Sequence, residues 1–188
     1  NMPLNIVVCI KQTPSTGSVA INPDTGEIRK EGVSYAISPF DEYALEEGIR
    51  LRERFPGGVT LALTMGGPQA EEILRESIAR GVDGVYHLCD SAFDGSDTYA
   101  TSYILSQGIR KIEEERKIKI DLVVCAKQTN DGDSGQVGPG LAAWLDWPNV
   151  AFVKKVEQVT DASLKIHRAM EDGTDVLEIA RPALISVV

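Results

Sequence analysis

A glycine-rich segment, AKQTNDGDSGQVGPG at residues 126–140, carries the residues best suited to chemistry. Gly132, Gly135 and Gly138 recur at every third position, and glycines let backbone N–H groups turn inward to form an anion-binding nest. A helical pattern follows, and its N-terminal dipole favours an anion at the same place. The segment is therefore a candidate phosphate site, with the hydroxyl of Ser134 as a further donor.

Two carboxylates in the same segment, Asp131 and Asp133, would repel a phosphate. If a phosphate binds here, these side chains must point away from it, toward backbone N–H groups or a ribose hydroxyl. The alternative is a solvated turn, because asparagine, aspartate and glycine favour turns in any case. From the segment alone, the two interpretations remain equally open.

Other nucleotide and metal motifs do not fit. The chain has no G-x-x-x-x-G-K-[ST] sequence and so no P-loop. GPGLAA at 138–143 matches G-x-G-x-x-A but lies too far beyond its strand for the dinucleotide fingerprint. An EF-hand starting at Asp131 would place Gln136 and Ala142 where the calcium loop needs glycine and an acid, so we expect no metal site.

Catalytic machinery is not evident either. His87 and His167 are the only histidines, and neither has an acid or a nucleophile at a meaningful spacing, so we expect no catalytic residue. Lys11 and Lys127 each follow an apolar run and should lie at a binding edge, as phosphate partners or as strand-end lysines. The pattern favours a protein that holds a nucleotide.

Composition narrows the class of protein. The 188 residues are 43% hydrophobic with a net charge of −9, which is typical of a globular domain and argues against nucleic-acid binding. No apolar run approaches the roughly 20 residues that span a bilayer, so we expect no membrane insertion. Cys9, Cys89 and Cys125 are odd in number and far apart in the sequence, which indicates reduced thiols in the cytoplasm.

The elements that must position these residues alternate along the chain. Strand patterns cover 4–10, 58–65, 84–90 and 119–126, and helical patterns cover 38–55, 67–81, 96–116 and a short stretch before Pro148. Ser38 is the expected N-cap of the first helix. The last part reads as strands joined by turns, at 149–159, 163–170, 175–180 and 183–188.

This alternation predicts an α/β fold: a Rossmann-like, doubly wound, mainly parallel sheet in a single domain over 1–188, with a C-terminal β-hairpin region. Ligands in such folds bind at the carboxyl ends of the strands. The loops expected there are 11–18, 64–69, 90–98 and 126–140.

Several stretches then resemble one family, the beta subunits of electron-transferring flavoproteins, over nearly the whole chain. They are NIVVCIKQTPSTG, INPDTGEIRKEGV, SPFDEYALEEGIRLRE, LTMGGPQAEEILRESIARGVD, DGSDTYAT, AKQTNDGDSGQVGP and RPALISVV. The resemblance implies an adenine-nucleotide-binding fold and a heterodimer with an alpha subunit that carries FAD. It also implies AMP or FAD in this subunit, and electron exchange with NADH or with a dehydrogenase such as acyl-CoA dehydrogenase.

Carried over position by position, the resemblance implies a set of nucleotide contacts. They are Cys9, Ser38, Pro39, Phe40, Asp41, Met65, Ala126, Lys127, Gln128, Thr129, Asn130, Asp131, Gly132, Asp133, Ser134, Gly135, Gln136 and Val137. DGDSGQVGP and KQTPSTG look more like the flavin-bifurcating members than the mitochondrial ones, which favours FAD over AMP.

Three expectations complete the sequence reading. Family members continue beyond "ALISVV" with a partner-recognition loop and an arm, so we expect a truncated or an unusually short member, with Asn1 as a tag remnant. The alternative to an electron-transferring subunit is a nucleotide-binding module of the universal-stress type without redox activity, which has the same sheet order and a glycine-rich loop. A subunit whose AMP is purely structural is the third reading.

Overall fold

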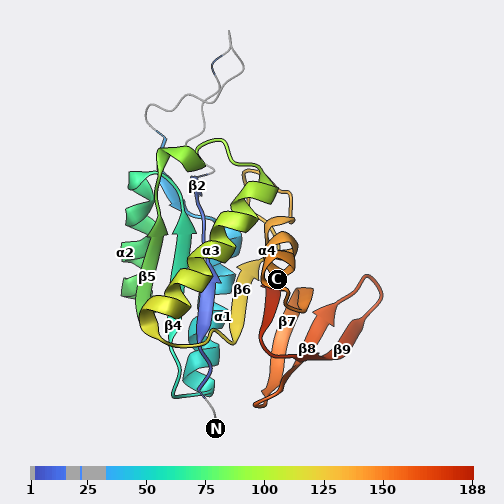
Figure 1. Cartoon of the computed structure of the whole chain (residues 1–188). Helices are drawn as coiled ribbons and strands as arrows, with labels where there is room; N and C mark the ends of the chain where they lie inside the picture. Colours follow the sequence, from blue (N-terminus) through green and yellow to red (C-terminus); the bar gives the residue numbers. More distant parts are fainter. Residues whose placement is uncertain (1–2, 16–21, 23–32) are drawn as a thin grey trace.

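A computed structural model describes residues 3–15, 22 and 33–188 of the chain. Eight strands form one sheet in the order β5-β4-β1-β6-β10-β7-β8-β9 (Figure 1). Their bounds are β1 Ile6–Cys9, β4 Thr60–Met65, β5 Gly84–Leu88, β6 Leu122–Ala126, β7 Asn149–Val159, β8 Ser163–Ala169, β9 Thr174–Ala180 and β10 Ala183–Val187. The strands from β5 to β7 pair in parallel, and β8 and β9 add an antiparallel extension.

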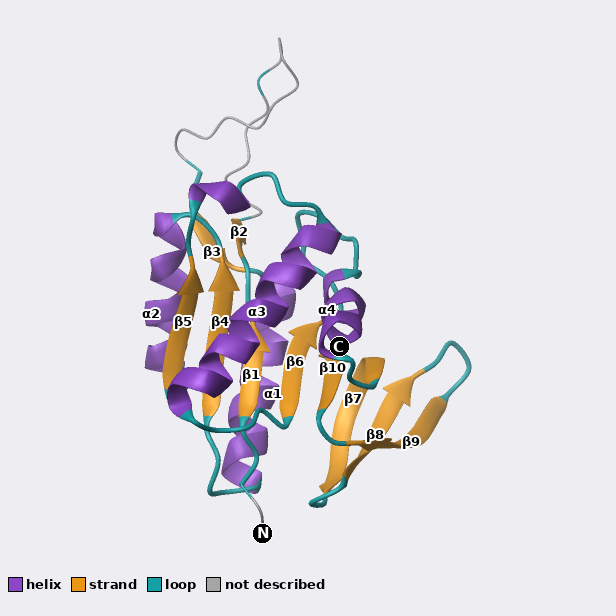
Figure 2. Cartoon of the chain, in the orientation of Figure 1, coloured by secondary structure: helices purple, strands orange, loops and turns teal. Residues whose placement is uncertain are grey.

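Helices cover both faces of the parallel part (Figure 2). Their bounds are α1 Pro39–Arg54, α2 Glu71–Arg80, α3 Thr98–Arg116 and α4 Val137–Leu145, with short 3-10 turns at Pro68–Ala70 and Ser91–Phe93. Strand alternation builds the two cores. In β1, Ile6 and Val8 pack on the side of α1 and α2, whereas Val7 and Cys9 pack on the side of α3 and α4.

A side-chain cap is present at one of the four α-helices of the described residues, α3, and the predicted N-cap position of α1 at Ser38 is confirmed. The side chain of Asp97 accepts the N–H of Ala100 at 2.8 Å and caps α3. Ser38 is the N-cap of α1, but its hydroxyl makes no capping hydrogen bond; its carbonyl accepts the N–H of Asp41 at 2.8 Å instead. Pro39 at the first helical position sets the backbone there.

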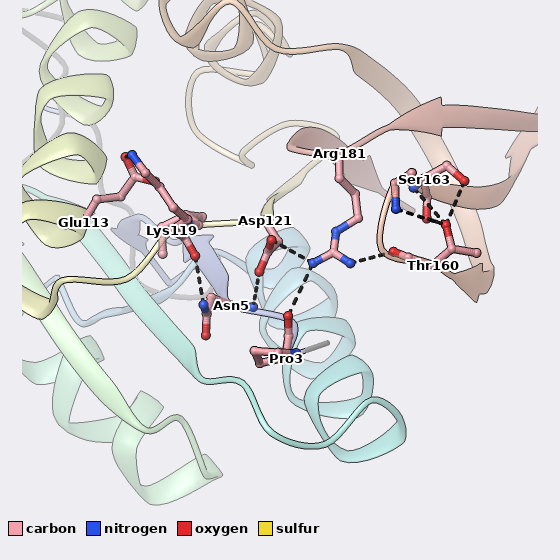
Figure 3. Close-up of polar contacts among 10 residues, drawn as sticks. Pro3, Asn5, Glu113, Lys119, Asp121, Thr160, Ser163 and Arg181 are labelled. Carbon is pink, nitrogen blue, oxygen red and sulfur yellow. Dashed lines mark hydrogen bonds and ion pairs between the residues drawn. The ribbon is translucent and has the colours of Figure 1, made fainter. Parts of the chain in front are cut away.

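An ion pair at the amino ends of β1 and β6 fastens the C-terminal strands to the rest of the sheet (Figure 3). Arg181, in the turn between β9 and β10, lies 2.7 Å from Asp121 and donates to the carbonyls of Thr160 and Pro3 at 2.6 and 3.4 Å. The other oxygen of Asp121 accepts the N–H of Asn5 at 2.8 Å. The side chain of Arg181 is only 6% exposed, so this contact is a buried anchor.

The predicted fold class is confirmed, including the parallel sheet with helices on both faces and the C-terminal hairpin. One loop differs from expectation, because Gln12–Pro14 forms a strand, β2, that pairs with β3 at Tyr35–Ile37. Asn1, part of the 11–18 loop and most of the INPDTGEIRKEGV motif lie outside the described residues. Within 3–15, 22 and 33–188, no helix is long and apolar enough to cross a membrane.

Candidate functional site

The candidate site is a cavity of about 450 Å³ at the carboxyl ends of β1, β4 and β6. This is the edge at which parallel α/β sheets bind ligands, and the volume lies in the usual range for small-molecule sites. Its walls come from the ends of these strands, from the loops after β1, β5 and β6, and from residues of α1, α3 and α4. Loops far apart in the sequence therefore meet at one place (Figure 1).

Most of the residues expected to contact a nucleotide line this cavity. They are Cys9, Asp41, Met65, Ala126, Lys127, Gln128, Thr129, Gly132, Ser134, Gly135 and Val137. The others lie outside its lining: Ser38, Pro39, Phe40, Asn130, Asp131, Asp133 and Gln136. Phe40 stays close to the rim, because the Lys127 Nζ atom lies 5.3 Å from the centre of its ring.

The carboxylate of Asp131 accepts hydrogen bonds from three donors. Its two oxygens accept the Thr129 hydroxyl and the Gly132 N–H, both at 2.7 Å, and the Lys11 ammonium at 2.6 Å. Partial burial works to raise the pKa of Asp131, but the hydrogen bonds from Lys11 and Thr129 outweigh it and lower the pKa below its ordinary value. The carboxylate is thus satisfied within the protein.

The carboxylate of Asp133 also has a partner within the protein, because it accepts a hydrogen bond from the Gln128 amide. Its backbone has a positive φ of 50°, a left-handed conformation that aspartate tolerates better than most residues. Neither acidic side chain lines the cavity. Both carboxylates therefore have hydrogen-bond partners within the loops.

Backbone geometry at the end of the segment suits an anion. Gly135 has a φ of 62°, and a Cβ placed there would lie 3.2 Å from the Lys127 carbonyl oxygen. The turn leads directly into α4, whose first-turn N–H groups at Val137 and Gly138 have no acceptor within the helix. A Cβ at Gly138 would come within 2.9 Å of the Ser186 hydroxyl, so glycine lets α4 start close against the sheet. Helix N-termini of this kind bind anions.

Asp41 is a buried carboxylic acid in the cavity lining. Its carboxylate accepts the backbone N–H of Lys11 at 2.8 Å and is 4% exposed. Burial raises its pKa from 3.8 to about 7, against the opposing effect of that hydrogen bond and of the Lys11 charge. Asp41 therefore changes its charge near neutral pH, directly beside the cavity.

Sequence reasoning missed one wall. The loop after β5 and the start of α3 contribute Phe93, Asp94, Gly95, Ser96, Asp97, Thr98, Thr101 and Leu105. Ile10, Lys11, Cys125 and Gly138 complete the lining. The sequence does place the 90–98 loop, and Lys11 after the first strand, at the ligand-binding edge of the sheet. It gives no pattern that identifies which residues of the 90–98 loop line the cavity.

The histidines make structural contacts outside the cavity. His87 Nε2 lies 3.0 Å from the Gly66 carbonyl oxygen, and His167 Nε2 lies 2.5 Å from a carboxylate oxygen of Glu157. Neither histidine lines the cavity. Both rings are thus engaged by groups of the fold.

Comparison with known proteins decides the family. The model of the electron transfer flavoprotein domain matches residues 25–188. The chain belongs to the electron transfer flavoprotein family. Within this family it is similar to "Electron transfer flavoprotein subunit beta" of Thermoanaerobacterium thermosaccharolyticum, with 46% identity over 98% of the chain and 68% of the relative.

Two further electron transfer flavoprotein relatives cover the same extent. "Caffeyl-CoA reductase-Etf complex subunit CarD" of Acetobacterium woodii is 42% identical over 98% of the chain and 68% of the relative. "Protein FixA" of Azotobacter vinelandii is 43% identical over 98% of the chain and 66% of the relative. The chain thus spans about two thirds of the length of these relatives.

Family membership fixes the broad function as electron transfer by a flavoprotein and does not favour the universal-stress reading. The similarity is to proteins named as beta subunits, which implies an alpha subunit as partner. The resemblance drawn from the sequence motifs is confirmed.

Proposed function

We propose that the cavity binds the adenosine and phosphate end of FAD and that the chain acts as the beta half of an electron-transferring heterodimer. The observation that carries this proposal is the pairing of two environments in one cavity. Met65 and Leu105 offer apolar surface for an adenine ring, and the turn at Gly135 ahead of α4 offers backbone N–H groups for phosphate.

Charge supports a nucleotide with few phosphate charges. Lys11 is paired with Asp131, so Lys127 is the lysine of the lining without a carboxylate partner among the described residues. Acidic groups also line the cavity, namely Asp41, Asp94 and Asp97. A triphosphate would meet this negative field directly, whereas a monophosphate or the diphosphate of FAD can rely on backbone donors and the helix dipole.

When bound, FAD supplies a ring that accepts and releases electrons. The residues of this chain would hold its adenosine half, exclude water from the apolar wall and orient the phosphates at α4. An alpha subunit with its own FAD would supply the second redox centre, and NADH or a dehydrogenase such as acyl-CoA dehydrogenase would deliver electrons. We propose a cytoplasmic setting, in which the free thiols of Cys9, Cys89 and Cys125 stay reduced.

The direct test is the identity of the nucleotide that co-purifies with an alpha–beta complex. The released nucleotide is measured by absorption and by mass, and its amount is compared with that of each subunit. FAD in excess of the alpha subunit's own share supports the proposal. AMP alone in the beta site would instead support a purely structural nucleotide, and ATP would support a nucleotide-sensing module.

A second test asks whether the partner completes the site. The adenosine and phosphate contacts come from this chain's loops, whereas the flavin ring needs a second wall to exclude water. The chain alone should bind AMP, and adding the alpha subunit should tighten FAD binding by about 1–3 kcal/mol, the usual range of coupling between sites. FAD fluorescence titrations with and without the alpha subunit measure this. Tight FAD binding and full-rate hydride uptake from NADH by the chain alone would contradict the idea.

A further inference from the structure

Two cysteines that are far apart in the sequence lie side by side in the sheet. Val8 of β1 pairs with Val124 of β6 in parallel register, so the next residues, Cys9 and Cys125, are neighbours on adjacent strands. Both belong to the core that faces α3 and α4, so their side chains project from the same face. Adjacent strands lie about 4.8 Å apart, within the range of Cα separations that two bridged sulfurs require.

Both thiols also border the cavity. Cys9 and Cys125 are 9% and 6% exposed, and both residues line the cavity wall. A small reagent can reach them from the cavity, and a ligand in the cavity would cover them. Cys89 lies outside the lining and is exposed, so the chain contains its own single-thiol comparison.

The surroundings favour the thiol form of Cys125. The pKa of Cys125 is raised well above its ordinary value. The largest cause is a hydrogen bond with the Cys9 thiol, the second is burial, and the nearby Asp41 acts in the same direction. Ionic metal thiolates and attack on peroxide both need a thiolate and are therefore disfavoured at Cys125. Among the described residues, no group of three or more His, Cys, Asp or Glu side chains could hold a metal ion.

We propose that Cys9 and Cys125 form a dithiol site for trivalent arsenicals, reached through the nucleotide cavity. A reagent R–As=O condenses with the two thiols: two As–S bonds form, and the oxygen leaves as water with the two thiol protons. Arsenic stays trivalent and the product carries no charge. A neutral product suits a buried site beside a carboxylate better than a charged metal complex does.

This site would compete with the nucleotide, and this second part rests on the proposed function. The arsenic atom that joins the two cysteine sulfurs, together with its substituent R, would occupy space at the cavity wall that adenosine needs. Conversely, at a nucleotide concentration about 100 times its Kd, the open fraction falls to about 1%, and arsenical labelling should slow by about 100-fold. Nucleotide and arsenical should therefore exclude each other.

The test uses phenylarsine oxide and the 188-residue chain freed of nucleotide. Intact mass in excess monothiol should show a single adduct on the wild-type chain and on Cys89→Ser, and a dithiol such as dithiothreitol should remove it. Cys9→Ser and Cys125→Ser should each lose the monothiol-resistant adduct. Tryptic mapping of the wild-type adduct should recover the two peptides that contain Cys9 and Cys125 joined through arsenic, a result that does not depend on the folding of any variant.

Several outcomes would overturn the proposal. A resistant adduct that survives in Cys125→Ser, or one that maps to Cys89, would show that the pair is not the site. An unchanged labelling rate with AMP bound, as verified by calorimetry, would show that the cavity is not the route. If calorimetry detects no AMP binding while the bridged peptides form, the proposed nucleotide function fails and the dithiol site stands.

Discussion

Gly135 offers the sharpest test of the proposed phosphate site. Its φ of 62° is costly for any residue with a Cβ, by about 1–2 kcal/mol, and a Cβ would also lie 3.2 Å from the Lys127 carbonyl oxygen. A branched side chain adds to both effects. In Gly135→Val the turn must therefore move, and the backbone N–H groups that we propose as phosphate donors shift with it. We expect AMP or FAD binding to weaken at least about tenfold, or about 1.4 kcal/mol.

Gly132→Ala is the matched control in the same loop. Gly132 also lines the cavity, but its φ lies outside the left-handed region, and a Cβ there meets nothing closer than the Thr129 hydroxyl at 3.9 Å. Alanine keeps the N–H that bonds Asp131. Affinity should stay within about twofold, well below the tenfold that corresponds to 1.4 kcal/mol.

Isothermal calorimetry with AMP and with FAD measures both variants, after thermal unfolding without nucleotide has shown that each is folded. The difference between Gly135→Val and Gly132→Ala is the informative quantity, because both change one glycine of one loop. Wild-type affinity in Gly135→Val would refute the assignment of this turn to phosphate. Equal weakening in the two variants would refute the argument from backbone geometry.

Three further predictions concern Asp41, Arg181 and the histidines. Burial raises the pKa of Asp41 from 3.8 to about 7, so the folded chain keeps a proton that the unfolded chain has lost, and this group's contribution to stability should fall as pH rises from about 4 to 7. Denaturant unfolding across this pH range measures the free energy of unfolding, which should fall by up to about 4 kcal/mol less in Asp41→Asn than in the wild type. Parallel pH profiles of variant and wild type would contradict this prediction. Arg181→Met leaves the partly buried carboxylate of Asp121 without its ion-pair partner and should lower the free energy of unfolding by about 3 kcal/mol. Arg75→Met, the control, breaks an exposed ion pair of similar length and should lower it by under about 1 kcal/mol. Equal losses in the two variants would contradict the assignment of Arg181 as a buried anchor. Replacing His87 and His167 with glutamine should leave electron transfer by the reconstituted complex within about threefold, because a lost general acid or base would cost about 100-fold or more.

Local patterns were sufficient for the sheet and its helices. The apolar run at 119–126 predicts a buried strand, and Leu122–Ala126 is one. The helical pattern at 67–81 predicts a helix that ends at Gly81, and Gly81 is the C-cap of α2 with a φ of 114°. Alternation of strands and helices implies parallel pairing with right-handed crossovers, which brings the loops after the strands to one edge. The position of the cavity therefore follows from patterns that each span only a few residues.

Pairwise contacts within the site depend on strand order, which the sequence does not specify. Lys11 meets Asp131, 120 positions away, only because β1 and β6 are neighbours in the sheet. The same adjacency brings Cys9 beside Cys125. The short pairing of β2 with β3 was missed for a similar reason, since three residues per strand are too few to show a period.

The charges around the cavity are compatible with the anionic nucleotide proposed for it, even though the net charge of the chain is −9. Asp131 and Asp133 are hydrogen-bonded within the loop, so they neither repel the ligand at contact distance nor need its donors. Lys11 is already engaged by Asp131. The donors left for the proposed phosphate are the Lys127 ammonium, the Ser134 hydroxyl and the backbone N–H groups at the start of α4, and the positions of these N–H groups are set by the fold. On the proposed function, recognition through backbone donors would select a ligand by shape, and the glycines of the loop would matter more than its few positive charges.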